Sequence, residues 1–358
     1  MNYMISSKTK ETIMRFNSAE ELGYVIITDY VKANTGEDVS DAIQKVIDEN
    51  PNRTIFFPDG EYILAKSIMT PAAPEKSVAL KLSNYAILRA SADWNSDEAM
   101  VRLGAIHSAN DINTPGSNYF FEGGIIDGNN VANGLSIDGG RETAVRYVSI
   151  KRTFIGLYIK YGVNNCSSDC DIDTVNIVGN GKPGSIGLLI DACDNTLTNM
   201  RIASVQIGVK VNHASNFFRN IHPLFIYEPE LVDHYQESYG FYDTSSGNWY
   251  DMCYSDQFAT AFYMGPRTMN IYDICRSFWY SPAGNKQVGF EVAGQFNSVL
   301  KSCEINFRFP KVDGKYMTVA EEGGTGSIDT PLVNDELCKD DTYKKYTKGN
   351  VIWRPKSH

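Results

Sequence analysis

The chain lacks any apolar stretch long enough to cross a bilayer, and no apolar run follows the charged residues near its N-terminus. The sequence therefore predicts neither a membrane partner nor a signal peptide. Clusters of basic residues are also missing beyond Lys344-Lys345, and the net charge is −10. A nucleic-acid partner is excluded on that ground, because such proteins carry a basic face.

Paired cysteine motifs are absent as well. The seven cysteines are odd in number and contain no CxxC pair, which argues against a disulfide framework. Buried free thiols fit a reducing compartment, so we expect a cytoplasmic protein, or a secreted one if a leader has been removed. Cys253, Cys275 and Cys303 recur at similar spacing, as small apolar residues stacked in a core would.

What the sequence does contain is an internal repeat. A glycine followed by an apolar, a variable and an apolar residue recurs at intervals of 22, 31, 21, 32, 21 and 28 residues. The copies begin at Gly134, Gly156, Gly187, Gly208, Gly240, Ala261 and Gly289. Eight residues later stands Asn164, Asn195, Asn216, Asn248 or Asn297, replaced only by Glu142 and Met269. A period of this length is typical of a solenoid.

The repeat predicts an all-β chain folded as a single-stranded right-handed parallel β-helix, with the asparagines stacked inward at one corner. A coil cannot bury its apolar face alone, so the open end needs a cap. Residues 38–47 supply a helix with Val39, Ala42, Ile43, Val46 and Ile47 on one face. We expect residues 1–53 to hold an extension and this capping helix, 54–310 the β-helix, and 311–358 a C-terminal cap or tail.

An amphipathic helix followed by a strand ending in Phe57-Pro58-x-Gly60-x-Tyr62 resembles the N-terminal cap of the pectin-lyase-like superfamily. The repeats extend that resemblance over roughly residues 37–310. It implies polysaccharide lyases, glycoside hydrolases, fructan-cyclising transferases, epimerases or phage tailspikes, and fold alone does not choose among them. The Asn-Thr-Asp, Gly-His-Gly and Arg-Ile-Lys blocks of polygalacturonase-type hydrolases are absent.

The three long intervals all gain residues just before the next glycine, at about 178–186, 222–239 and 280–288. Loops inserted at one corner would stand as ridges along a groove. The middle insertion is rich in carboxylates, and glycoside cleavage needs two of these. We therefore expect Asp233 and Glu237 to be the acid/base pair, with Asp251 or Asp256 as the alternative second carboxylate and Glu230 as a further candidate.

Counting residues along the strands places Asp251 beside Arg219 and Tyr254 beside His222, so Arg219, His222 and Tyr254 are candidate substrate-binding residues. Trp249 and Trp279 could stack on sugars, although aromatic side chains at such corners also simply cover core. Asp243 occupies an inward position that is apolar in every other repeat. A buried carboxylate there needs hydrogen bonds or a special role.

Asp169, Asp171 and Asp173 lie on one strand face, where they could bind calcium as in pectate-lyase-type enzymes or form a solvated coil edge. The second interpretation is simpler, so no metal or cofactor is predicted. Together these features favour an enzyme that cleaves or transfers a glycosyl unit of an oligo- or polysaccharide, as a glycosidase or fructotransferase-like enzyme does. The alternatives are a lyase or epimerase of acidic sugars and a non-catalytic glycan-binding or structural β-helix. The resemblance also suggests a homotrimer about the long axis.

Overall fold

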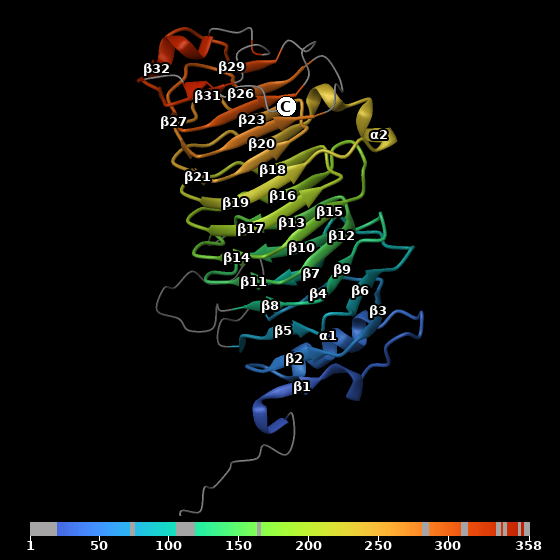
Figure 1. Ribbon diagram of the computed structural model, residues 1–358. Coiled ribbons are helices and arrows are strands. Elements are labelled where there is room, and N and C mark those ends of the chain that lie inside the picture. Colours follow the sequence, from blue (N-terminus) through green and yellow to red (C-terminus); the bar gives the residue numbers. More distant parts are fainter. Residues whose placement is uncertain are drawn as a thin grey trace, which may run out of the picture.

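The computed structural model describes residues 20–71, 76–104, 119–162, 166–280, 286–308, 314–333, 338, 342–349 and 352–353. Within these ranges the strands form one sheet of 23 strands and one of 10, all paired in parallel between successive coils (Figure 1). This arrangement confirms the predicted parallel β-helix. No helix in the described ranges is long and apolar enough to span a membrane.

The larger sheet has two arms that meet at a corner. The first arm contains β1 (Tyr24–Ile26), β2 (Thr54–Phe57), β5 (Ala79–Leu82), β8 (Phe120–Glu122), β11 (Ala144–Arg146), β14 (Asp171–Asp173), β21 (Trp249–Asp251), β24 (Ile271–Asp273), β27 (Val299–Lys301), β30 (Ser327–Asp329) and β32 (Thr347–Lys348). The second arm contains β3 (Gly60–Leu64), β6 (Ala86–Ala90), β9 (Ile125–Asp127), β12 (Ser149–Thr153), β15 (Asn176–Gly179), β22 (Tyr254–Asp256), β25 (Arg276–Trp279), β28 (Glu304–Phe307), β31 (Leu332–Val333) and β33 (Ile352–Trp353). Two longer strands, β17 (Thr196–Ala203) and β19 (Phe217–Leu224), run through both arms and join them.

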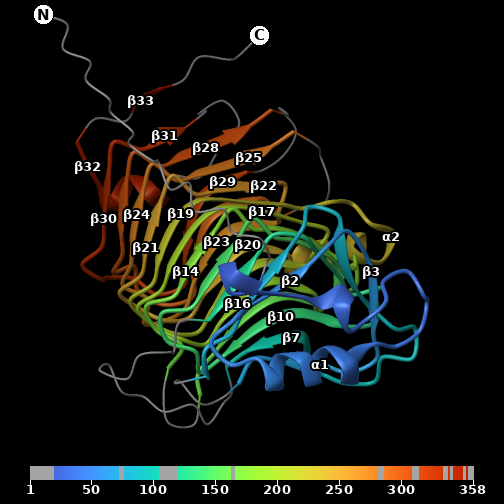
Figure 2. The ribbon, with the colours of Figure 1, turned by 90° about the horizontal axis from the view of Figure 1, so that it is seen from below.

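The smaller sheet forms the third side of each coil. It contains β4 (Ile68–Met69), β7 (Ala99–Leu103), β10 (Asn133–Asp138), β13 (Ile155–Lys160), β16 (Ile186–Ile190), β18 (Ile207–Val211), β20 (Tyr239–Asp243), β23 (Thr260–Met264), β26 (Val288–Val292) and β29 (Lys315–Val319). The view from below in Figure 2 shows the coils stacked behind one another, with α1 beside the first of them.

The predicted capping helix is α1 (Ser40–Glu49), which buries Ile43, Val46 and Ile47. It packs beside β4, the terminal strand of the smaller sheet, and the Gln44 amide donates to the carbonyl of Met69 at 2.9 Å. Covering this edge keeps it from pairing with another chain. Three short 3-10 helices, η1 (Glu20–Leu22), η2 (Ile27–Asp29) and η5 (Thr342–Tyr346), lie near the two ends of the described chain.

The repeat glycines stand where the smaller sheet approaches the second arm. A Cβ atom on Gly156 would lie 2.5 Å from Cγ2 of Ile177 and 2.6 Å from the carbonyl oxygen of Gly187. Nothing larger than hydrogen fits between the two walls at that distance. This close approach explains why the repeat that marks the fold begins with glycine.

From β11 to β31, the corner between the two arms is made by one residue with positive φ in each coil. These residues are Tyr147, Thr174, Asn199, Asn220, Met252, Ile274, Ser302 and Thr330, with φ between 49° and 59°. The residue that follows points inward, and in three successive coils it is Cys253, Cys275 or Cys303, each fully buried. The cysteine column is therefore core, as predicted.

The asparagine column is confirmed for Asn195, Asn216 and Asn248, which are at most 1% exposed. The Asn195 side-chain amide donates to Asn216 Oδ1 at 3.1 Å, and the Asn216 backbone N–H donates to Asn248 Oδ1 at 2.8 Å. In the next two coils the column moves on by one residue, to Asn270 and then Ser298.

The prediction that Asn297 belongs to this column is therefore wrong. It is only half buried, and it accepts a hydrogen bond from the Thr325 backbone N–H at 3.0 Å. The turns before β24 and β27 each hold one extra residue, which the fixed offset of eight did not anticipate. Asn164 lies outside the described residues.

Asp243 does point into the core, where it is 1% exposed. Its carboxylate accepts hydrogen bonds from Tyr250 Oη at 2.6 Å, Asn270 Nδ2 at 2.7 Å and Asn248 Nδ2 at 2.9 Å. The Ser245 backbone N–H donates to the other oxygen at 2.7 Å. Asp243 thus fastens the asparagine column to the aromatic core, and the coil continues in register on both sides.

The predicted end of the β-helix at residue 310 is too early. β29 pairs in parallel with β26, β30 with β27 and β31 with β28, and β32 and β33 add to the larger sheet. These strands are short and separated by polar turns, so their alternation is hard to detect in the sequence. The segment expected to be a cap or tail supplies a further coil.

Candidate functional site

The carboxylate-rich insertion between β19 and β20 forms a ridge, residues 225–238, that projects beside the coils (Figure 1). It contains α2 (Pro229–Val232) and η4 (Tyr235–Glu237). A small apolar cluster of its own, Phe225, Leu231, Tyr235, Phe258 and Ala259, holds it against the following coil. As predicted, the long insertions at 180–185 and 225–238 share the corner between the second arm and the smaller sheet, and most of the third insertion lies outside the described residues.

The carboxylates that the sequence places on this ridge do not form a compact group. Glu230, Asp233 and Glu237 are all exposed, and Glu237 lies 3.5 Å from His234 Nδ1 in a solvated pair. The helical turns of the ridge direct these side chains toward water because the apolar residues between them turn inward. In the described part of the chain, no group of three or more His, Cys, Asp or Glu residues is arranged to hold a metal.

Three other predicted residues do come together, on the outer face of the second arm next to the ridge. Strand pairing places Leu224 beside Asp256 and therefore His222 beside Tyr254. The His222 and Tyr254 rings stack with their centroids 4.3 Å apart. Asp256 Oδ2 lies 3.4 Å from Tyr254 Oη and 3.7 Å from His222 Nε2. These three residues form the centre of the candidate site.

Asp256 is withdrawn from water, with 10% of its side chain exposed. Its Oδ1 and the Nε2 of His222 are covered, yet neither has a hydrogen-bond partner among the described residues. Covered polar atoms are normally paired, so these two unpaired atoms are candidates for bonding a ligand. Burial, and next the Asp256 carboxylate, raise the pKa of the Tyr254 hydroxyl, which therefore stays protonated and able to donate.

Aromatic and basic side chains continue this surface along the axis. The Arg276 guanidinium lies 5.9 Å from the centre of the Tyr254 ring and 2.6 Å from Glu304 Oε2. Phe278 meets Tyr254 edge-on with centroids 6.5 Å apart, and Tyr280 beside it is 44% exposed. An aromatic strip flanked by hydrogen-bonding groups suits a sugar ring, which has apolar faces and a polar rim.

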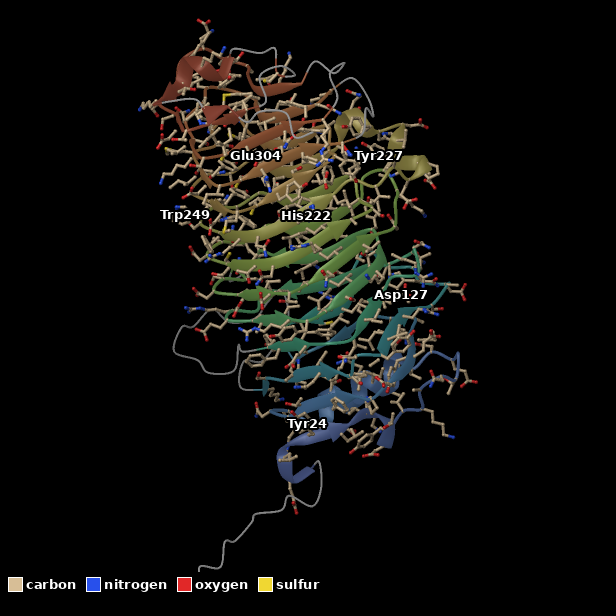
Figure 3. All side chains as sticks on the ribbon, viewed as in Figure 1. Tyr24, Asp127, His222, Tyr227, Trp249 and Glu304 are labelled. Carbon is tan, nitrogen blue, oxygen red and sulfur yellow. The ribbon has the colours of Figure 1, made fainter. Side chains whose placement is uncertain are left out.

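Arg276 and Glu304 were missed in the sequence, although they stand 28 residues apart, at coil spacing. Strand pairing places them side by side on β25 and β28. Figure 3 shows Glu304 and His222 over the coils and Tyr227 at the ridge. Counting one coil onward from Tyr254 would have located Arg276, and counting a second coil would have located Glu304.

The other predicted pair, Arg219 and Asp251, forms on the first arm, with 3.3 Å between Arg219 Nε and Asp251 Oδ2. Trp249 lies on the same strand as Asp251 and is 46% exposed. In Figure 3 Trp249 stands at the opposite edge of the coils from Tyr227. The left-handed corner separates this pair from His222 and Asp256, so the predicted residues divide into two groups.

Trp279 does not fit the stacking role suggested for it. The side chain is 1% exposed, its indole N–H donates to the carbonyl of Phe258 at 2.7 Å, and its ring stacks on Phe307. Alternation along β25 turns Trp279 inward and Phe278 outward. The outward aromatic surface is therefore supplied by the exposed Tyr280 and by Phe278, which is half-buried beneath Arg308.

The aspartates considered for calcium each have their own partner. Asp169 lies 3.0 Å from Arg141, and Asp171 forms an ion pair with Arg146. Asp173 accepts hydrogen bonds from Thr198 and Asn199 at 2.7 and 2.8 Å. This arrangement matches the coil-edge interpretation.

No family model and no curated protein matches the chain. Among solved structures it is similar to the surface adhesin PfbA of Streptococcus pneumoniae, with 11% identity, a TM-score of 0.56, and coverage of 92% of this chain and 96% of that one. It is also similar to the tailspike protein of E. coli bacteriophage HK620, solved with a hexasaccharide, with 8% identity, a TM-score of 0.57, and coverage of 88% and 67%. ORF18 of Geobacillus virus E2 matches at 12% identity and a TM-score of 0.43, with 88% of this chain and 62% of that chain covered.

The likenesses to PfbA and to the HK620 tailspike, together with the sheet topology, define the fold: the chain is a right-handed parallel β-helix. The resemblance first drawn from the capping helix and the strand after it is thereby confirmed at the level of the fold.

Proposed function

We propose that this protein is a carbohydrate-active enzyme that binds an oligo- or polysaccharide along the second arm beside the ridge and cleaves or transfers a glycosyl unit there. The observation that carries the proposal is Asp256, a covered carboxylate with an unpartnered oxygen next to His222 and Tyr254. The β-helix neighbour solved with a hexasaccharide supports a glycan as the ligand. Phe278 and Tyr280 supply the stacking surface.

In this proposal Asp256 is the proton donor to the leaving glycosidic oxygen, because it is the ridge-side carboxylate held away from water. Tyr254 and His222 orient the carboxyl group and the sugar. The second carboxylate comes from the ridge, with Asp233 and Glu237 as candidates and Glu230 behind them. Asp251 with Arg219 and Trp249 would bind a more distant part of a long chain, around the corner.

The test is a glycan panel followed by conservative variants. Asp256→Asn should lower turnover by about 10²–10⁴-fold, the usual contribution of a general acid, and leave the thermal unfolding midpoint close to that of the parent. Asp233→Asn and Glu237→Gln then test the ridge, and Asp251→Asn tests the distant pair. Full activity in Asp256→Asn, on a substrate that the parent cleaves, would place the chemistry elsewhere.

Running the panel with and without EDTA separates the reaction classes. Hydrolysis or transfer by paired carboxylates needs no metal, whereas loss of activity in EDTA together with unsaturated products would favour the lyase alternative. Sedimentation analysis of the intact chain tests the predicted homotrimer.

A second candidate is a non-catalytic glycan-binding protein. The ridge carboxylates are exposed and dispersed, and the adhesin PfbA matches this chain over nearly the whole length of both. Under this alternative no glycan is turned over, and Tyr280→Ala weakens binding. Retention on an immobilised glycan, measured beside product formation, distinguishes the two.

A further inference from the structure

A cavity of about 220 Å³ lies on the outer face of the smaller sheet, on β7, β10 and β13. It is lined by Asp97, Glu98, Ala99, Asn133, Leu135, Ser136, Ile155, Tyr158 and Lys160. The candidate site described above uses β19, β22 and β25 of the other sheet. The two sites therefore share no residue and no strand.

Ser136 gives the cavity an unsatisfied group. The residue is 0% exposed, and its hydroxyl has no hydrogen-bond partner within the described residues. A covered hydroxyl without a partner costs free energy, which a ligand donor or acceptor reaching into the cavity would recover. By contrast, the Asn133 side chain is satisfied, since it donates to the Asp97 carbonyl and accepts from the Ile155 N–H.

The two cations at the cavity are each paired with a carboxylate. Lys160 Nζ lies 2.6 Å from Glu98 Oε2 and 3.4 Å from Asp138 Oδ1, and Arg102 lies 2.6 Å from the other Asp138 oxygen. Two carboxylates thus face two cations, with Asp97 adding one negative charge at the exposed rim. A strongly charged ligand would have to displace one of these pairs, so a neutral ligand fits best.

The walls add an apolar component. Tyr158 donates its hydroxyl to Asp191, which fixes the ring, and Lys160 lies 5.4 Å from the ring centre. Ile155 lines the cavity beside it. An aromatic wall opposite hydroxyl and charged hydrogen-bonding groups is the combination that binds a polyhydroxylated ring. The volume is below that of pockets for drug-sized ligands, about 300–1,000 Å³, and suits a single ring.

We propose that this cavity is a second ligand site that binds one neutral sugar residue, free or as part of a longer glycan. The bound ring lies against Tyr158, one of its hydroxyl groups bonds Ser136, and Glu98 and Lys160 contact its rim. The proposal does not depend on catalysis at Asp256. The cavity would be a non-catalytic binding site on another side of the β-helix.

The experiment uses the full chain and saturation-transfer NMR with methyl glycosides of glucose, galactose, mannose, rhamnose and N-acetylglucosamine. Each is present at about 10 mM, at which a site with a Kd near 1 mM is almost filled. We expect at least one glycoside to show transfer, and glucuronate and galacturonate to show little. The signal should persist in Asp256→Asn, which separates this cavity from the proposed catalytic site.

Two variants assign the signal to the cavity. Ala99→Leu fills the space and should abolish transfer, whereas Ser136→Ala removes one hydrogen bond and should weaken binding by about threefold to tenfold. Thermal unfolding confirms that each variant is folded, and if Ala99→Leu is not, Ser136→Ala carries the test. Absence of transfer from every glycoside, or equal transfer in the parent and both variants, would overturn the proposal.

Discussion

The two halves of the β-helix are filled by different side chains. From β9 to β17 the inward-facing residues of the second arm are aliphatic, with Ile126, Ile150, Ile177 and Ile202 in successive coils. From β19 onward, aromatic rings take over the other two sides. Phe218, Tyr250 and Tyr272 stack at 4.7 Å spacing on the first arm, and Phe241, Phe262 and Phe290 at 4.8 and 5.1 Å on the smaller sheet.

Large rings on two sides leave less room on the third. In the same coils the inward residues of the second arm become Pro223, Ser255 and Ser277. Small inward residues on the second arm thus accompany the large rings on the other two sides, as close packing requires. The coils that contain the aromatic rings also contain buried polar side chains. Among the buried carboxylates of this half, Asp243 is the least exposed. The half with the polar core is also the half that carries the ridge and the Asp256 site.

Asp243→Leu tests whether the aromatic half depends on its buried carboxylate. The substitution removes the acceptor of Tyr250, Asn248 and Asn270 together. We expect a loss of at least about 3 kcal/mol in the free energy of unfolding, because each unmet buried donor costs about 1–3 kcal/mol. Denaturant unfolding measures the loss. A change below about 1 kcal/mol would mean that the rings alone hold these coils together.

Asp243→Asn tests the role of the same buried carboxylate through the pH dependence of the free energy of unfolding. Burial raises the pKa of Asp243 above the 3.8 of an exposed aspartate, so the native chain binds the proton more tightly than the unfolded chain. That contribution is complete below pH 3.8 and is lost as the pH rises through the raised native value. The stability of the parent relative to Asp243→Asn should therefore fall as the pH rises above 3.8 and through the raised native pKa. A difference that rises over this range would contradict the assignment.

Asn216→Ala tests the column that links the two halves. Asn216 bonds Asn195 on one side and Asn248 on the other, and its amide also donates to the Ala192 carbonyl at 2.9 Å. We expect a loss of about 1–3 kcal/mol by denaturant unfolding. Asn297→Ala, outside the column, is the matched control and should cost less than about 1 kcal/mol. Equal losses in the two variants would show that the column adds nothing.

Ile274→Asn is expected to stabilise the protein. Ile274 has a φ of 53° and is 53% exposed, so a β-branched side chain occupies a left-handed corner with little burial to compensate. Asn199 and Asn220 fill the same corner in earlier coils. Relief of the left-handed conformation should raise the free energy of unfolding by about 1 kcal/mol. Ile271→Asn, in the adjoining strand, is the control and should give no gain.

Thiol titration tests the redox state and accessibility of the cysteines, where we expect the smallest effect. Cys193 is half buried and the other cysteines in the described ranges are buried, so native protein should react first at Cys193. Denatured protein alkylated before any reductant should give seven free thiols if the predicted cytoplasmic location is right. The sulfurs of Cys166 and Cys193 lie 3.1 Å apart. Five free thiols, with that pair joined, would contradict the cytoplasmic prediction.

Features that repeat from coil to coil could be predicted from the sequence. Features that depend on one contact between distant residues could not. The repeat glycines such as Gly156 and the column asparagines such as Asn216 recur because sterics and backbone hydrogen bonding impose them, and the offset of eight held as far as Asn248. Alternation also paired His222 with Tyr254 correctly. It could not show that Phe225 and Phe258 hold the ridge against Asp256, because that burial comes from residues far apart in the chain. The prediction for Trp279 was wrong because the corner at Ile274 sets the register of β25, and in that register Trp279 points inward.

The left-handed corner has a consequence for how such a protein can change over evolutionary time. From β11 to β31 one residue turns the chain there in each coil, so an insertion at that position would shift the strands that follow. The other two corners already hold connections of very different length, from a single residue at Phe154 to the whole 225–238 ridge. Loops can therefore be exchanged at those corners, and specificity replaced, while the frame that carries them is inherited unchanged.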